Sequence, residues 1–260
     1  NTIEGMSGLT ALIGYPGGQP VMLSNALGDP VSGLTGTIAL LSALAARERD
    51  GRGRLIEAAQ LEGFLPLVAE SLIEYQRTGV IPPRNGNRRP GHVPSGAFPC
   101  RDGEWVAIEV DSDAGWASFA GLIGEPWAVD ETLASLPGRE AREDELERQL
   151  AEWMRAWNGD ELVEACLAAG VVAAPVLTEG EILSLEPLVE SGFWEGEERA
   201  HVGFHLYPGL PIRGESGRPE ASGPAPTLGE HTTEVLAALG LGTEELLRLA
   251  AEDVIGSRPA

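Results

Sequence analysis

The chain has 260 residues, a formal net charge of −22 and a hydrophobic content of 43%. This length suggests one large or two modest domains, and the hydrophobic content is sufficient for a buried core. A strongly acidic surface repels nucleic acids and anionic membranes, so we expect neither as a partner.

The two cysteines, Cys100 and Cys166, do not have the spacing of a metal site. Cys166 falls on an apolar helix face, where packing in the core is the simpler interpretation. The sequence shows no signal peptide and no apolar run of the roughly 18–20 residues that a membrane span needs. We therefore expect a reduced, cytoplasmic protein with no metal site and no resident cofactor.

The first strong helix signal follows 28 glycine-rich residues. A helix is predicted from about Pro30 to Arg49, with Asp29 as its N-cap and Pro30 at its first helical position. Its apolar residues recur with helical spacing and line one face. The sequence Asp50-Gly51-Arg52-Gly53 is expected to end this helix. A short strand is expected next at Leu55 and Ile56, followed by a second helix at about 58–77 that ends at Gly79.

A linker rich in proline, glycine and arginine at residues 80–97 indicates a domain boundary. The later elements expected are a hairpin from Ala97 to Val110 turning at Arg101-Asp102-Gly103, helices at about 113–123, 143–157 and 160–169, a strand at 171–176, an alternating segment from Phe193, a proline- and glycine-rich connector at 217–226, and helices at about 231–239 and 243–250. The acidic run Glu140–Glu147 is interpreted as a solvated helix face.

Asp29 is the first candidate for chemistry because a glycine turn places it at a helix start. Main-chain N–H groups at a helix start stabilise negative charge, so a carboxylate held there can stay ionised and act as a nucleophile. The alternative is that Asp29 only caps the helix, and the two interpretations are compatible.

Four segments, in the same order along the chain, resemble the family III CoA-transferases (CaiB/BaiF), which include formyl-CoA transferase, carnitine CoA-transferase and the α-methylacyl-CoA racemases. The segments are Gly28-Asp29 with Ala46–Arg54, Gly86–Pro90 with Val93-Pro94 and the Phe98–Gly103 hairpin, Ala169–Val171 with Ala174–Val176, and Leu228–Leu236.

The resemblance implies an α/β fold with part of a Rossmann-like large domain, a smaller α+β domain and an interlocked dimer. The expected domains are a large-domain segment at 1–80, a linker and small α+β domain at 81–192, and a return linker with C-terminal helices at 193–260. Family members carry an upstream region that supplies much of the CoA site. We therefore expect an absent N-terminal part, a homodimer, or a partner chain carrying that half.

The resemblance also implies site residues. Asp29 would be the nucleophile that transfers coenzyme A between an acyl-CoA and a carboxylic acid through anhydride and thioester intermediates, with coenzyme A as a substrate. Residues implied in substrate or CoA binding are Gly28, Gly86, Asn87, Arg88, Arg89, Gly91 and His92. Each of these loop assignments has a structural alternative. The loop could be an ordinary linker, Arg88 and Arg89 a solvated pair, and His92 a residue without a functional role.

Two other functions stay open at this point. In a racemase, Asp29 would shuttle the α-proton of a 2-methylacyl-CoA, although the histidine that racemases place upstream is absent from residues 1–28. In a split enzyme, this chain would be a subunit that is not catalytic alone.

Overall fold

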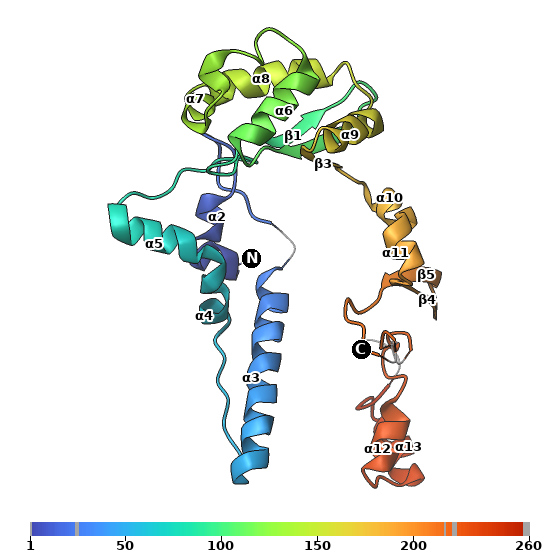
Figure 1. Ribbon diagram of the computed structural model, residues 1–260. Helices are drawn as coiled ribbons and strands as arrows, with labels where there is room; N and C mark the ends of the chain where they lie inside the picture. Colours follow the sequence, from blue (N-terminus) through green and yellow to red (C-terminus); the bar gives the residue numbers. More distant parts are fainter. Residues whose placement is uncertain (1, 24–25, 216, 220–222, 257–260) are drawn as a thin grey trace. The chain divides into compact units, whose positions relative to one another are not determined.

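The computed structural model describes residues 2–23, 26–215, 217–219 and 223–256. The chain divides into two compact units, Asn1–Val176 and Leu177–Ala260, and each is described by itself (Figure 1). Part of the predicted connector at 217–226 lies outside the described residues. The mixture of helices and strands confirms the predicted class.

The first unit begins with helices, of which α3 is the longest. They are α1 (Thr2–Met6), α2 (Leu9–Leu12) and α3 (Gly28–Asp50). Gly51 ends α3 in the left-handed region (φ 71°) and donates its main-chain N–H to the carbonyl of Arg47 at 2.7 Å. This is the glycine stop that the sequence predicts, because only glycine takes that conformation without a steric penalty.

Helix α3 exposes its apolar face in this unit. Leu34, Ile38 and Leu41 are 68%, 66% and 59% exposed, and Gly28 is the one buried residue of the helix. By length and composition α3 could also cross a membrane, contrary to the sequence-based expectation that no stretch qualifies. A core helix of a soluble protein and a signal sequence meet the same criterion, so this feature alone identifies no membrane protein.

The second predicted helix is broken. It consists of α4 (Gln60–Phe64), the 3₁₀ turn η1 (Leu65–Val68) and α5 (Ala69–Thr78). Pro66 lies at the break, where it cannot donate a main-chain hydrogen bond to the preceding turn. The short strand predicted at Leu55 and Ile56 is wrong, because neither residue pairs with another described strand and Leu55 is 89% exposed.

A three-stranded antiparallel sheet forms the other half of the first unit. Its strands, β1 (Ser95–Pro99), β2 (Trp105–Glu109) and β3 (Val172–Pro175), lie in the order β1-β2-β3. The helical elements that accompany it are α6 (Asp113–Ile123), η2 (Glu131–Leu133), α7 (Leu136–Ala141), α8 (Glu143–Met154) and α9 (Gly159–Ala168). The predicted hairpin, three helices and strand are thus confirmed, whereas η2 and α7 were not predicted.

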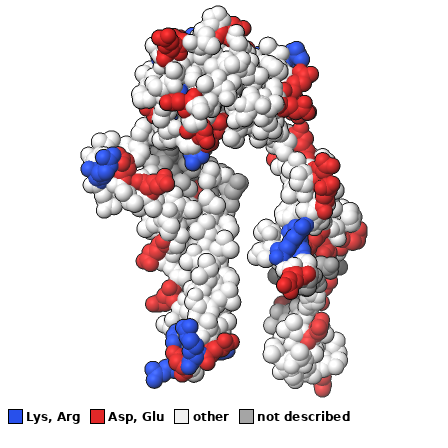
Figure 2. All heavy atoms as spheres, in the orientation of Figure 1, with Lys and Arg blue, Asp and Glu red and all other residues white. Residues whose placement is uncertain are grey.

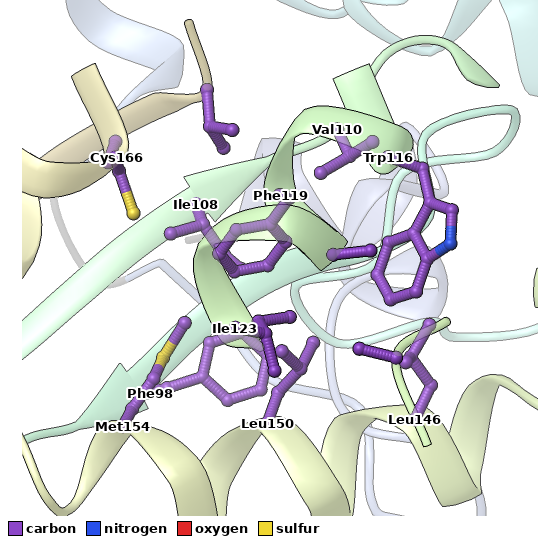
Figure 3. Close-up of a cluster of buried hydrophobic side chains, with 14 of the residues drawn as sticks. Phe98, Ile108, Val110, Trp116, Phe119, Ile123, Leu146, Leu150, Met154 and Cys166 are labelled. Atoms are coloured by element: carbon purple, nitrogen blue, oxygen red, sulfur yellow. The ribbon is translucent and has the colours of Figure 1, made fainter. Parts of the chain in front are cut away.

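The core of this half lies between one face of the sheet and the helices (Figure 3). Val106 and Ile108 alternate with less buried neighbours along β2, as expected for a sheet with one covered face, and Phe98 of β1 pairs with Val106 on the same side. Trp116 packs edge-to-face on Phe119, with ring centroids 6.2 Å apart. Cys166 is fully buried here, so its predicted packing role is confirmed.

The described residues of the second unit form four short helices and one hairpin. The elements are α10 (Glu179–Ser184), α11 (Glu186–Glu190), β4 (Trp194–Arg199), β5 (Gly203–Pro208), α12 (Thr232–Ala238) and α13 (Thr243–Ala251). Strands β4 and β5 pair antiparallel, and Thr178 with Glu181 forms a capping box at the start of α10. The two predicted C-terminal helices are confirmed.

Candidate functional site

Asp29 lies in the first turn of α3, two positions further into the helix than the sequence predicts. Leu27 occupies the N-cap, Gly28 is the first helical residue and Asp29 the second, so the predicted N-cap role is wrong. The Asp29 main-chain N–H donates to the carbonyl of Ala26 at 2.9 Å, which extends the helix backward. Ala26 has a φ of 47°, a strained conformation for a residue with a side chain.

The carboxylate of Asp29 is exposed and has a side-chain partner. Gln60 Nε2, at the start of α4, donates to Asp29 Oδ1 at 3.2 Å. This contact joins two helix starts 31 residues apart in the sequence. Sequence reasoning missed Gln60 because no local pattern reports a pairing between distant helix ends.

Gly28 has a packing role beside Asp29. It is buried, and a Cβ at this position would lie 3.3 Å from Ile3 Cβ of helix α1. The start of α3 therefore lies directly against α1, and a larger residue at position 28 would push the two helices apart. Whether Gly28 also contacts a substrate stays a prediction.

The loop from Gly86 to Pro94 is anchored to the N-terminal segment. Gly86 has a φ of 63° and donates its N–H to the carbonyl of Gly14 at 2.8 Å. A Cβ at residue 86 would meet the ring of Tyr15 at 2.7 Å. Arg84, just before the loop, donates to the carbonyls of Ala11 and Gly18 at 3.2 and 2.6 Å. Glycine at 86 is thus explained by conformation and close packing.

Arg88 binds three carboxylates of helix α8. Its guanidinium lies 2.7 Å from Glu147 and 3.4 Å from Glu143, and it also contacts Asp144. The hydrogen bonds that Arg88 donates to Glu147 are the largest cause that raises the pKa of Arg88 above its ordinary value. Burial raises the pKa of Glu143. The acidic run is therefore not a purely solvated face, because three of its carboxylates hold the loop.

Arg89 and His92 share one carboxylate of strand β2. Arg89 Nη1 and His92 Nδ1 each lie 2.8 Å from Glu109 Oε1. The histidine contact is an ion pair only when the imidazole is protonated, and Nδ1 makes no hydrogen bond to a described residue. Gly91 has a φ of 79° and allows the tight turn in which the His92 N–H donates to the carbonyl of Arg89. The loop residues thus lie together against β2 and α8.

A cavity of about 290 Å³ lies beside this loop. Its lining includes Asn87 and Arg88 from the loop, Tyr15 from the N-terminal segment, Trp105 from β2 and Glu147 from α8. Within the described ranges, no hydrogen bond or ion pair joins Asp29 to the loop. The structure therefore brings the predicted loop residues together and places Asp29 in a separate cluster with Gln60.

Among the residues that the structure describes, no group of three or more His, Cys, Asp or Glu side chains is placed so that it could hold a metal ion. His231 lies at the N-cap of α12 and makes no side-chain capping hydrogen bond.

Residues 1–232 match CoA-transferase family III. The chain belongs to this family. Among the family's characterised members, succinyl-CoA–D-citramalate CoA-transferase of Chloroflexus aurantiacus is 30% identical over 256 residues, which are 97% of this chain and 63% of that protein. The alpha subunit of succinyl-CoA–L-malate CoA-transferase from the same organism is 31% identical over 252 residues, 96% of this chain and 59% of that subunit.

A solved structure supports the same assignment. The crystal structure of a CaiB/BaiF family protein from Brucella suis superimposes with a TM-score of 0.79 at 28% identity, covering 91% of this chain and 61% of that one. The chain therefore has the family fold, and it spans about three fifths of the length of these relatives.

Proposed function

We propose that this chain supplies the catalytic aspartate of an enzyme that transfers coenzyme A from an acyl-CoA to a carboxylic acid. The observation that carries the proposal is the position of Asp29. Its carboxylate is exposed on the first turn of the 23-residue helix α3, and it belongs to a chain of CoA-transferase family III.

The proposed reaction needs no oxidant or metal. The Asp29 carboxylate attacks the thioester carbonyl, the C–S bond breaks, and a mixed anhydride forms with release of the CoA thiolate. The thiolate then attacks the Asp29 carbonyl, which gives an aspartyl thioester and frees the donor acid. The acceptor carboxylate attacks this thioester to form a second anhydride, and the thiolate takes the acceptor acyl group, which regenerates Asp29.

Gln60 has a defined place in this scheme. It donates to Asp29 Oδ1, so it orients the carboxylate and leaves Oδ2 available for attack. An amide donor beside the aspartyl carbonyl would also stabilise negative charge in the tetrahedral intermediates.

The Gly86–Pro94 loop is proposed to cover the acyl group and exclude water, since mixed anhydrides hydrolyse. Its fixed shape supports this role, because Arg88 is held by α8 and Arg89 by Glu109. Asn87 lines the neighbouring cavity and is the loop side chain proposed to contact substrate.

A partner surface on α3 is part of the proposal. Between Pro30 and Ala46 the helix has no charged residue, and Figure 2 shows an uncharged surface over most of its length with charges gathered at one end. The hydroxyls of Ser32, Thr35 and Thr37 bond to carbonyls four residues back, which leaves the helix surface largely apolar. Because relatives are longer and one is named as an alpha subunit, we propose that this face packs against the remainder of the enzyme, in a dimer or on a partner chain.

The test is a transfer assay on the complete enzyme that contains this chain. Succinyl-CoA is the first donor to use because two relatives are named for it, with a panel of dicarboxylic acids as acceptors and new acyl-CoAs detected by mass. Asp29→Asn should abolish transfer.

Asp160→Asn is the matched control, since Asp160 is an exposed aspartate in the same second position of helix α9, also after a glycine. Deuterium uptake at the acyl α-carbon in D2O without an acceptor acid would contradict the transferase proposal and favour the racemase.

A further inference from the structure

Glu4 is a buried carboxylate with too few partners. It is 1% exposed, yet carboxylates are seldom fully buried without a cation or several donors. Its Oε2 accepts one hydrogen bond, from the Leu23 main-chain N–H at 3.2 Å. Its Oε1 is buried and finds no hydrogen-bond partner among the described residues.

The contacts of α1 fall on both sides of the turn that leads to Asp29. Glu4 holds Leu23, where the chain enters the turn, and Ile3 packs directly on Gly28, where α3 begins. Helix α1 therefore contacts the chain at Leu23 and again at Gly28, the residue next to Asp29.

The backbone is strained at Ala26, three residues before Asp29. Ala26 is left-handed with a φ of 47°, and its carbonyl accepts the Asp29 N–H. A conformation of this kind costs about 1–3 kcal/mol and persists only where the surroundings hold it. Among the described residues, the Glu4 hydrogen bond to Leu23, the Ile3 packing on Gly28 and the Gln60 hydrogen bond to Asp29 all support the start of α3, and the first two come from helix α1.

We propose that Glu4 is a positioning residue for Asp29. Its buried carboxylate ties α1 to Leu23, and Ile3 of the same helix packs on Gly28, so the anchored helix fixes where the first turn of α3 presents the nucleophile. Glu4 itself touches no reacting atom. The proposal rests on the role of Asp29 in the proposed function.

The experiment compares Glu4→Ala, Glu4→Gln and the wild-type sequence in the complete enzyme. The first readout is the rate of Asp29 acylation in a single turnover with succinyl-CoA, together with KM. Glu4→Ala should slow acylation by about tenfold to a hundredfold with KM changed less than about twofold, because a displacement of about 1 Å can cost that much in rate. Glu4→Gln keeps an oxygen acceptor for the Leu23 N–H and should recover most of the rate.

The control is Glu62→Gln, which makes the same change at an exposed glutamate of α4 and should behave as wild type. A second readout needs no activity: hydrogen exchange at the Leu23 and Asp29 amides, both hydrogen-bonded in the structure, should accelerate in Glu4→Ala while the β1–β2 amides keep their protection.

Wild-type acylation and exchange rates in Glu4→Ala would overturn the proposal. So would a loss of rate in Glu4→Gln equal to that in Glu4→Ala. An enzyme that transfers CoA without ever acylating Asp29 would instead refute the proposed function, and the exchange experiment would still decide whether Glu4 holds the turn.

Discussion

Arg139 ties the end of the Gly86–Pro94 loop to the helical half of the first unit. It is 1% exposed, and its guanidinium donates to the carbonyl of Val93 at 2.7 Å and to that of Leu133 at 3.1 Å. A third nitrogen lies 2.9 Å from Asp113 Oδ1, and the group stands 5.8 Å from the centre of the Trp116 ring. We predict that Arg139→Met destabilises this unit strongly.

The magnitude follows from these contacts. A hydrogen bond from a charged donor contributes about 1.5–3 kcal/mol, and the substitution removes two to main-chain carbonyls while leaving those carbonyls without that donor. Asp113 is 57% exposed and returns to water, so its ion pair adds little. The expected loss in the free energy of unfolding is about 3–5 kcal/mol, a large part of the roughly 5–15 kcal/mol typical of a domain.

The assay is urea unfolding followed by tryptophan fluorescence, since Trp116 and Trp153 lie in or against this core. Arg155→Met is the matched control, because Arg155 is an exposed arginine at the end of α8. It should change the free energy of unfolding by less than about 0.5 kcal/mol. An Arg139→Met protein as stable as this control would refute the reasoning.

Three other predictions concern separate parts of the first unit. The hydrogen bond from the Thr132 main-chain N–H, with an arginine beside it, lowers the pKa of Asp130 to about 2. The stability that ionised Asp130 contributes is therefore complete above about pH 4 and is lost as the pH falls toward 2. Asp130→Asn should flatten the pH dependence of the melting temperature in that window, and an unchanged slope would contradict this. Burial raises the pKa of Cys166 to about 11, so a thiol reagent at pH 8 should label it only on unfolding, and labelling at the rate of a free cysteine would show that the core is open. Gly86→Ala should lower the melting temperature more than Gly91→Ala, because both glycines have positive φ but only Gly86 lies against a tyrosine ring, and equal effects would refute the packing argument.

Local signals in the sequence account for most of the elements. The Asp102-Gly103 turn between two apolar runs predicts the β1–β2 hairpin, and amphipathic spacing predicts α6, α8 and α9. The glycine at 51 marks the end of α3 for a steric reason that any helix shares. These features depend on neighbouring residues, so one sequence suffices to predict them.

Tertiary contacts account for the errors. Leu55 and Ile56 have the composition of a strand but no described strand pairs with them. The arginine at 88 was interpreted as a ligand-binding or solvated residue, and its contact with three carboxylates of α8 depends on how the loop folds back over that helix. Gln60 and Glu4 reach the Asp29 turn across the fold, and no periodicity reports such contacts.

The most direct test of the account is the mass of this chain after brief incubation of the complete enzyme with succinyl-CoA, followed by acid quenching and peptide mapping. We predict an adduct of succinyl or CoA mass on the peptide that contains Asp29, absent from Asp29→Asn and present in Asp160→Asn. Transfer activity with no adduct at Asp29, or an adduct that persists in Asp29→Asn, would contradict the central claim.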